Sequence, residues 1–170
     1  QTPIYLAKNR QSLGFITIAD PIKADSKLAI QKLQQMGVKV VMLTGDHRAT
    51  AQAIATQVGV TEVLAEVLPQ EKAHQIINLQ KAGNKVGMVG DGINDAPVLA
   101  GALISIAMGG GTQMARVSAD AVLLSERLME IQHAIQHSRF ALRVIRQNFA
   151  WALCYNALVL PIAALGLMTP

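Results

Sequence analysis

The sequence predicts an α/β fold built around a parallel sheet that is covered by helices on both faces. Three observations support this class. Strand-like and helix-like segments alternate along most of the chain, the strand-like segments are continuous apolar runs, and polar turns containing glycine follow several of them. Ligands of such sheets bind at the carboxyl ends of the strands, so these turns mark the candidate site.

An N-terminal hairpin is expected before the alternation begins, with strands over 4–7 and 13–18 and a break at Asp20-Pro21. Asp25-Ser26 is expected to cap the first helix. Glycine stands just past the ends of several helices, as at many helix C-termini. The expected helices are 27–36, 48–58, 69–82, 97–101 and 112–118, and the expected strands are 38–43, 62–65, 85–89, 104–107 and 121–124.

Length and composition set limits on the function. A chain of 170 residues can bury one full core, so one soluble domain is expected, with additional segments at its ends. The net charge of +4 does not indicate nucleic-acid binding, because aromatic residues are sparse and the late basic residues gather at Arg139, Arg143 and Arg146. A single cysteine, Cys154, excludes an internal disulfide. Gln1 in place of methionine suggests that the natural start lies upstream.

The strand over 85–89 runs into a glycine-rich turn that carries two carboxylates, Asp91 and Asp95, four residues apart. Gly90 and Gly92 let the backbone turn sharply, so both carboxylates can face one point. A small number of hard oxygen ligands suits Mg²⁺, which keeps several waters and accepts phosphate oxygens. The motif therefore predicts a metal-phosphate site, although an ordinary turn and cap role is the alternative for the isolated motif.

Two further polar segments are expected at the same end of the sheet. The turn Thr44-Gly45-Asp46 follows another strand, and Lys72 lies at the start of the helix over 69–82, from which it can reach the same crevice. Taken singly, Thr44 and Asp46 could instead cap the next helix, and Lys72 could be an ordinary surface lysine. Their joint presence beside Asp91 favours a functional role.

Other phosphate and metal motifs are excluded. No Gly-Lys-Ser/Thr occurs, and the glycines at 87, 90 and 92 have the wrong offsets for a dinucleotide fingerprint. The segment from Asp91 to Asp95 is not an EF-hand, because its glycine is second and no glutamate closes a twelve-residue loop. His133 and His137 share a helix face, but Ala134 stands where a zinc protease needs its glutamate.

In order and spacing, three motifs together resemble the phosphorylation domain of P-type ATPases, within the haloacid-dehalogenase-like superfamily. The resemblance covers nearly the whole chain and implies a Rossmann-like, three-layer fold with a parallel sheet. It also implies a reaction in which an aspartate attacks the γ-phosphate of ATP and the aspartyl-phosphate is later hydrolysed. The motifs are Thr44-Gly45-Asp46, Pro69-x-x-Lys72 and Gly90-Asp91-Gly92-Ile93-Asn94-Asp95-Ala96-Pro97.

The resemblance implies a role for each matching residue. Asp91 would ligate Mg²⁺, Asp95 would hold that metal site together, and Asn94 would contact the phosphoryl group. In the first motif, Thr44 and the Gly45 backbone would hold phosphate oxygens, and Asp46 would lie near the nucleotide and the hinge. In the second motif, Lys72 would neutralise charge on the phosphoryl group and its carboxylate. These roles suit phosphoryl transfer, which depends largely on positioning and electrostatics.

The chain departs from the family pattern in one important respect. The nucleophile of the family lies in Asp-Lys-Thr-Gly-Thr, and that sequence is absent between Gln1 and Pro170. The expected organisation is therefore a C-terminal portion, with 1–19 as the end of a nucleotide-binding domain and return hinge and 20–128 as part of the phosphorylation domain. A smaller departure is Leu103, where the family usually has an acidic residue.

The tail predicts a linker helix over 129–148 and a transmembrane helix over 149–168. The latter stretch has twenty uncharged residues, or about 30 Å of helix. The arginines lie only on its N-terminal side and Trp151 lies near that end, which indicates a cytoplasmic catalytic domain. A buried core helix is the alternative. The chain is thus expected to belong to an integral membrane protein of the bacterial inner membrane, in contact with the lipid bilayer.

Within the tail, three segments resemble the penultimate membrane helix of copper-transporting heavy-metal ATPases. The resemblance implies that Tyr155 and Asn156 contribute to the transport site for Cu(I), whereas zinc-type relatives carry a lysine that is absent here. Cys154 could assist Cu(I) or simply pack as a small residue. The three segments are Asn148-Phe149-Ala150-Trp151-Ala152, Tyr155-Asn156 and Leu160-Pro161-Ile162-Ala163-Ala164.

The sequence therefore predicts part of an ATP-driven, Mg²⁺-dependent Cu(I) export pump that lacks its nucleophile, so the isolated chain should be inactive. Expected partners are the actuator and nucleotide-binding domains, the other membrane helices and a copper chaperone, but no nucleic acid. Two alternatives remain open: a membrane-anchored phosphohydrolase of the same superfamily, and a residual fragment without turnover. The residues upstream of Gln1 would distinguish them.

Overall fold

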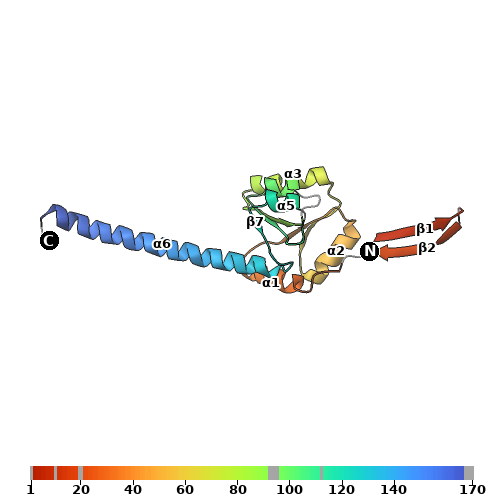
Figure 1. Cartoon of the computed structure of the whole chain (residues 1–170), viewed down its shortest axis with the longest axis horizontal. Helices are drawn as coiled ribbons and strands as arrows, with labels where there is room; N and C mark the ends of the chain where they lie inside the picture. The colour runs from red at the N-terminus through yellow and green to blue at the C-terminus, as the bar shows by residue number, and fades with distance from the viewer. Residues whose placement is uncertain (1, 10, 19–20, 92–95, 112, 167–170) are drawn as a thin grey trace. The chain divides into compact units, whose positions relative to one another are not determined.

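Strands and helices alternate after the N-terminal hairpin, as the sequence predicts, in a computed structural model of the chain (Figure 1). The structure describes residues 2–9, 11–18, 21–91, 96–111 and 113–166. The chain divides into two units, Gln1–Glu130 and Ile131–Pro170. All the strands belong to the first unit, and most of one long helix makes up the second.

The hairpin is longer than predicted. Its strands, β1 (Thr2–Lys8) and β2 (Gln11–Ile18), pair in an antiparallel manner. Tyr5 and Phe15 are opposite one another, with ring centroids 6.1 Å apart, so a cross-strand aromatic pair fixes the register. Asn9 occupies the turn with φ of 50°, a backbone conformation that asparagine tolerates better than most residues.

Every helix and strand expected between residues 25 and 124 is present, and the strands are mostly shorter than their apolar runs. The reason is that an apolar run also includes residues that approach the core without joining a hydrogen-bonded ladder. The strands are β3 (Val41–Leu43), β4 (Glu62–Leu64), β5 (Gly87–Gly90), β6 (Ile104–Ala107) and β7 (Ala121–Val122). The helices are α1 (Ser26–Gln35), α2 (Arg48–Val58), α3 (Pro69–Lys81), α4 (Ala96–Gly101) and α5 (Gln113–Ser118).

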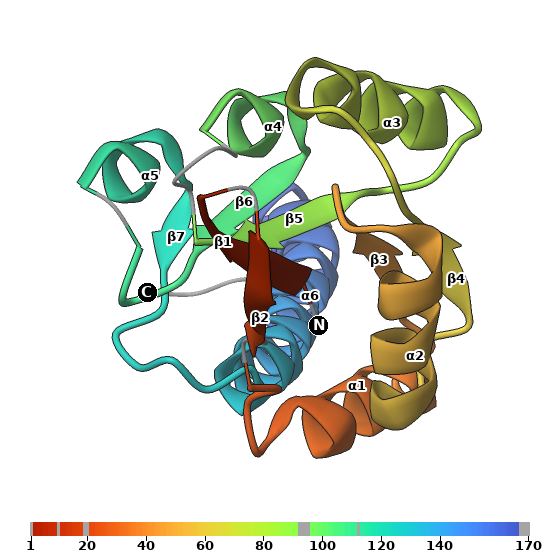
Figure 2. The same ribbon diagram turned by 90° about the vertical axis from the view of Figure 1, so that its right-hand side faces the viewer.

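The strands do not form one continuous sheet. β3 pairs only with β4, and β5, β6 and β7 form a second sheet in that order; all these pairs are parallel. Figure 2 shows the two sheets as separate pieces, with α1 and α2 beside β3 and β4, and α3, α4 and α5 along the other sheet. The parallel α/β class is therefore confirmed, and the expectation of a single sheet is corrected, because no described strand joins β3 to β5.

Each sheet has a core of its own. Beside β3 and β4, the buried side chains of Ile30, Ala55 and Val58 pack together from α1 and α2. Beside β5 to β7, Leu99 of α4 and Ala107 of β6 are fully buried and pack with Met88. The two clusters share no residue, so each sheet packs against helices of its own.

The structure corrects the prediction for residues 129–168. A single helix, α6 (Met129–Ala164), replaces the separate linker and transmembrane helices that the sequence predicts. It ends before a turn in which Gly166 has φ of 68°, so its uncharged part is residues 149–164, sixteen in number rather than twenty. Among the helices that the structure describes, none has both the length and the apolar character needed to cross a bilayer.

A buried serine joins the starts of β6 and β7. Asp120 Oδ2 accepts hydrogen bonds from the Ser105 hydroxyl at 2.7 Å and from the Ser105 N–H at 2.8 Å. Ser105 Oγ in turn accepts the Asp120 N–H at 3.0 Å. The hydroxyl donor and then the backbone donor hold the pKa of the Asp120 carboxyl below its ordinary value of 3.8, because both stabilise the carboxylate.

We expect Asp120→Asn to flatten the acid side of the stability curve. Because the folded-state pKa is depressed, the carboxylate contributes fully above pH 3.8, and that contribution is lost as the pH falls through the lower folded value. Urea unfolding of the chain between pH 2.5 and pH 6, in about half-unit steps, measures this difference. Equal slopes of unfolding free energy against pH in both proteins would show that the hydrogen bonds between Asp120 and Ser105 do not stabilise the fold through the carboxylate charge.

Candidate functional site

The loop after β3 holds the first predicted site residues in a fixed arrangement. Thr44 Oγ1 donates to Asp46 Oδ2 at 3.0 Å and accepts the Asp46 N–H at 3.1 Å. Neither side chain caps α2, because the cap position is taken by His47, whose Nδ1 accepts the Ala49 N–H at 3.4 Å. The capping alternative for Thr44 and Asp46 is therefore excluded, and both side chains remain at the carboxyl end of β3.

Backbone hydrogen bonds brace this loop against the segment after β4. The Thr44 N–H donates to the Leu64 carbonyl at 2.9 Å, and the Val67 N–H donates to the Thr44 carbonyl at 3.1 Å. A third bond joins the Glu66 N–H to the Asp46 carbonyl at 3.0 Å. Because backbone atoms alone make these bonds, the path of the loop does not depend on the identity of its side chains.

Lys72 lies five residues after Val67, which is the last residue that hydrogen-bonds to the Thr44 loop. A Cβ at Gly45 would lie 3.4 Å from the Val67 carbonyl oxygen, so the loop and the approach to α3 are in close contact. Pro69 opens α3, and the Lys72 N–H donates to the Leu68 carbonyl at 3.1 Å within the first turn. The predicted lysine therefore lies in the first turn of the helix that follows the braced segment.

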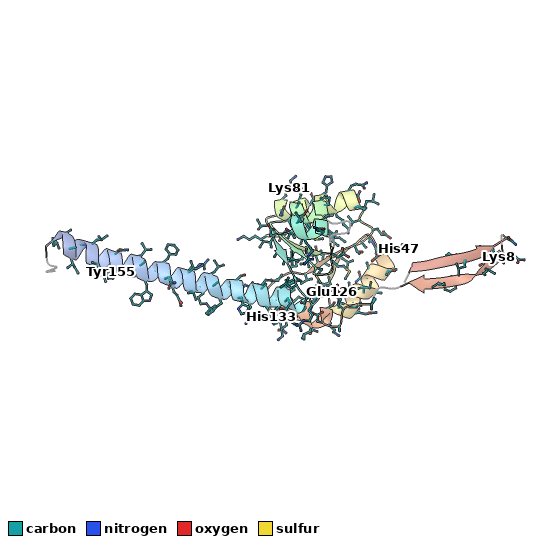
Figure 3. The ribbon with its side chains drawn as sticks, in the orientation of Figure 1. Lys8, His47, Lys81, Glu126, His133 and Tyr155 are labelled. Atoms are coloured by element: carbon teal, nitrogen blue, oxygen red, sulfur yellow. The ribbon has the colours of Figure 1, made fainter. Side chains whose placement is uncertain are left out.

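Glu66 is a site-supporting residue that the sequence analysis missed. Its backbone adopts φ of 60°, and its Oε1 accepts the Arg48 N–H at 3.2 Å and lies 3.4 Å from His47 Nε2. Both partners are at the start of α2, where Figure 3 labels His47. The one signal in the sequence was an acidic residue directly after a strand, and that signal alone does not identify a partner eighteen residues earlier.

Asp91 follows β5 and lies at a cavity of about 640 Å³ between the two sheets. Met42 of β3 and Val58 of α2 line one side, and Val89 of β5 and Met108 line the other. Met42 precedes Thr44 by two residues, and Val89 precedes Asp91 by two, so each polar loop follows a strand that borders the cavity. Asp91 is exposed, and the Met108 N–H donates to the Gly90 carbonyl beside it at 2.9 Å.

A glycine loop packs against the backbone of Asp91. The Gly111 N–H donates to the Met108 carbonyl at 2.9 Å, and a Cβ added at Gly111 would collide with the Asp91 carbonyl oxygen. Only glycine permits so close an approach of two chain segments. The run Gly109 to Gly111 therefore sets the position of Asp91 through the backbone.

The donor chemistry at Asp91 fits Mg²⁺. A carboxylate is a hard oxygen ligand, and Mg²⁺ commonly takes one or two carboxylates and completes its shell with water and phosphate. Within the described residues no group of three or more His, Cys, Asp or Glu side chains gathers as a closed metal site. Asn94 and Asp95, the other residues predicted here, lie outside the residues that the structure describes.

The residues predicted for metal transport lie on α6, in the second unit. Tyr155 and Asn156 are exposed, as is Cys154, and Figure 3 shows Tyr155 projecting from the helix. The structure thus brings Thr44, Gly45 and Asp46 into one loop, braced beside the segment that carries Lys72, and places Asp91 at the cavity.

Comparison with known proteins shows the family to which the chain belongs. A family model for haloacid dehalogenase-like hydrolases matches residues 1–102. The chain belongs to this family. A haloacid dehalogenase-like chain is expected to place its reacting groups at the carboxyl ends of parallel strands, where Thr44 and Asp91 are found.

Curated relatives that match the chain are named as copper pumps. The chain is 51% identical over 172 residues to the "probable copper-importing P-type ATPase A" of Enterococcus hirae, covering 100% of this chain and 24% of the relative. It is also 51% identical over 170 residues to a copper-exporting P-type ATPase of Staphylococcus aureus, covering 100% of this chain and 21% of the relative. The chain therefore spans about a quarter or less of the length of these relatives and is a homologue of one part of them.

Solved structures agree with this assignment. A zinc-transporting PIB-type ATPase in its E2.Pi state superposes with a TM-score of 0.87 at 39% identity, covering 99% of this chain and 28% of that one. The catalytic domain of a CPx-ATPase gives a TM-score of 0.62 at 31% identity, covering 73% of this chain and 48% of that one. The haloacid dehalogenase-like fold of a P-type ATPase is thus confirmed, including its parallel strands.

We expect Gly111→Ala to disturb the site through the Asp91 backbone. The new methyl group must displace the Asp91 carbonyl, which should lower the free energy of unfolding by about 1–3 kcal/mol, as overpacking commonly does. Gly101→Ala is the matched control, because open space surrounds a Cβ there and the change should be neutral or slightly stabilising. Chemical denaturation of both variants measures the difference, and equal stabilities would contradict the close approach.

Proposed function

We propose that the chain is the C-terminal catalytic part of a P-type ATPase that moves Cu(I) by means of an aspartyl-phosphate. The observation that carries the proposal is the cavity between β3 and β5, because Asp91 lines it and the braced Thr44 loop follows the strand on its other side. Residues 1–19 would end the nucleotide-binding domain, and 20–128 would form part of the phosphorylation domain.

The same cavity supports a role for a segment outside these 170 residues. The described part of the chain pairs β3 only with β4 and β5 only with β6, so each has an edge whose backbone groups need partners. The side chains facing the cavity include Ile30, Met42 and Val89, which are apolar. We infer that a strand of the complete protein completes the sheet there and brings the nucleophilic aspartate, which this sequence lacks.

The proposed chemistry assigns distinct work to each loop. The Gly45 N–H would hold a phosphate oxygen, and the Thr44 hydroxyl would hold another once its proton turns away from Asp46 Oδ2, to which it donates in the absence of phosphate. Asp46 would lie near the nucleotide and the hinge. The Lys72 ammonium would neutralise charge that spreads over the phosphoryl oxygens as it passes from ATP to the aspartate. When bound by Asp91 and Asp95, Mg²⁺ supplies positive charge to those oxygens.

The remaining assignments concern phosphate contact and transport. Asn94 would donate to the phosphoryl group, and Tyr155 and Asn156 of α6 would contribute to the path of the transported Cu(I). The complete pump would be an integral membrane protein of the bacterial inner membrane, with this catalytic part in the cytoplasm where ATP is supplied. Its partners would be the actuator domain, the nucleotide-binding domain, the other membrane helices and a copper chaperone.

We propose export as the direction, in line with the Staphylococcus aureus relative, which is named as copper-exporting. The Enterococcus hirae relative has the same identity and is named as copper-importing, so this part of the protein does not fix the direction. Uptake of radioactive copper into inside-out vesicles that contain the complete protein tests it. ATP-dependent accumulation in those vesicles corresponds to export from the cell.

We expect Asp91→Ala in the complete protein to lower Mg²⁺-dependent phosphoenzyme formation from labelled ATP by at least about 100-fold. The reason is that Mg²⁺, which stabilises the charge of the transition state, would lose a carboxylate ligand. Lys81→Ala, in the last turn of α3, is a control for the loss of a charged side chain outside the loops. The isolated 170-residue chain should give no acid-stable phosphoprotein. A labelled product from the isolated chain would mean that the nucleophile lies within it.

We expect Tyr155→Phe combined with Asn156→Ala to abolish copper transport in the complete protein while phosphorylation from inorganic phosphate persists. The reason is that the two substitutions remove the hydroxyl and amide groups from this part of α6 but leave the loops around Asp91 intact. Copper flux into vesicles and phosphoenzyme level are measured in parallel. Normal copper flux in the double variant, or equal stimulation of the parent ATPase by Zn²⁺ and Cu(I), would rule out the copper assignment.

A further inference from the structure

Asp25 holds the cap position of one helix while its side chain serves another. It stands at the N-cap of α1, where the sequence predicts a capping aspartate, but its carboxylate makes no capping hydrogen bond there. Instead Asp25 Oδ2 accepts the N–H of Met129, 104 residues later, at 2.9 Å. Only the Asp25 backbone serves α1, through its carbonyl and the Ala29 N–H at 2.9 Å.

Met129 is the first residue of α6, so the bond caps that helix from a distant segment. The first N–H groups of any helix lack partners within the helix, and an aspartate carboxylate is a favourable acceptor because of the helix dipole. Leu128, which precedes α6, has an apolar side chain that cannot accept a hydrogen bond. Asp25 therefore supplies the acceptor for the Met129 N–H, while the Arg127 carbonyl accepts the Glu130 N–H at 3.3 Å.

A second contact joins the same two segments. Lys23 Nζ lies 2.8 Å from Glu126 Oε2, and Figure 3 labels Glu126 just before α6. The Glu126 carboxylate also lies against Gly110, because a Cβ at Gly110 would collide with Glu126 Oε1. Gly110 belongs to the loop that packs against Asp91, so a chain of contacts runs from the candidate site to the start of α6.

The two contacts differ in strength. The side chains of Lys23 and Glu126 are 40% and 64% exposed, and exposed ion pairs usually contribute little. The bond from Asp25 is partly buried and satisfies a backbone donor at a helix start, where removing the acceptor has a measurable effect. The hydrogen bond that Asp25 accepts is therefore the stronger of the two contacts.

We propose that Asp25 is a positioning residue that couples the phosphorylation site to α6. It fixes the first turn of α6 to the segment 21–26, while Glu126 connects that segment to the glycine loop beside Asp91. Since α6 is one continuous helix to Ala164 and carries Tyr155 and Asn156, the start of this helix is where a change at the site reaches it. The inference rests on the proposed function, and loss of Asp25 would separate phosphorylation from copper-stimulated turnover.

The test uses the complete protein with Asp25→Ala, Asp25→Asn and the control Glu62→Gln. Asparagine keeps a side-chain oxygen that can accept the Met129 N–H, whereas alanine does not. Glu62 also carries a carboxylate in an ion pair, but it is in β4 and its partner, Lys39, lies outside α6. Phosphoenzyme formation from ATP, copper-stimulated hydrolysis and copper flux are measured for each.

In Asp25→Ala, we expect copper-stimulated hydrolysis and flux to fall by about fivefold, the size of a typical lost helix cap, with the phosphoenzyme level unchanged. Asp25→Asn and Glu62→Gln should match the parent protein in all three measurements. Parent-like flux in Asp25→Ala would overturn the coupling role, as would a parallel loss of phosphoenzyme. If the parent protein itself forms no phosphoenzyme, the proposed function fails, whatever the variants do.

Amide hydrogen exchange on the 170-residue chain gives a readout that does not depend on activity. In Asp25→Ala, exchange at the Met129 amide should rise about fivefold, while the Ala29 amide, which bonds to the Asp25 backbone, keeps its protection. In Asp25→Asn, both amides should remain protected. Unchanged exchange at Met129 in the alanine variant would show that Asp25 does not hold the start of α6.

Discussion

The arrangement of the first unit follows from two strand edges, one on β3 and one on β5, that pair with no other described strand. The backbone groups of a strand need hydrogen-bond partners, and β3 and β5, which are partly exposed, each pair with only one other strand within the described residues. Helices of each half supply separate cores, around Val58 on one side and Leu99 on the other, so the halves keep their form without a common ladder. The cavity between them is the consequence, and its position at the ends of both strands makes it the place where the polar loops meet solvent.

Backbone atoms, more than side chains, position the groups around this cavity. The Thr44 loop is held by three main-chain hydrogen bonds to the segment 64–67, and Asp91 is held by the close approach of Gly111. Groups fixed in this way need little rearrangement when charge develops on a bound phosphate, which is the condition for strong electrostatic stabilisation. Glu66 adds a carboxylate to this bracing by accepting the Arg48 N–H.

The sequence predicted local elements well and long-range partners poorly, for a physical reason. Apolar runs, proline at the start of α3 and glycine after α2 each act within a few residues, so the order of elements could be predicted. The motif residues Thr44 and Asp91 could be found because polar turns after strands are a local pattern. The partner of Asp25 could not, since nothing near an aspartate indicates a helix start 104 residues away.

The other two misses have similar causes. The split of the sheet could not be predicted, because apolar runs alone do not say which strands are neighbours. The uncharged stretch over 149–168 predicts more helix than the structure has, because a lack of charge does not mark where a helix ends. The helix ends at Ala164, two residues before the left-handed glycine Gly166.

The comparison with a zinc pump bears on where metal choice resides. A zinc-transporting ATPase shares the fold of this chain over 99% of its length, at a TM-score of 0.87, although the curated relatives at 51% identity are named as copper pumps. A phosphorylation site built from backbone donors, a lysine and carboxylates recognises phosphate and a hard cation, and nothing in that chemistry senses a soft metal. Under the proposed function, metal choice must therefore lie in a few side chains outside the first unit. A connection such as that between Asp25 and Met129 is then needed, because the site that releases energy and the residues that select the metal are on different parts of the chain.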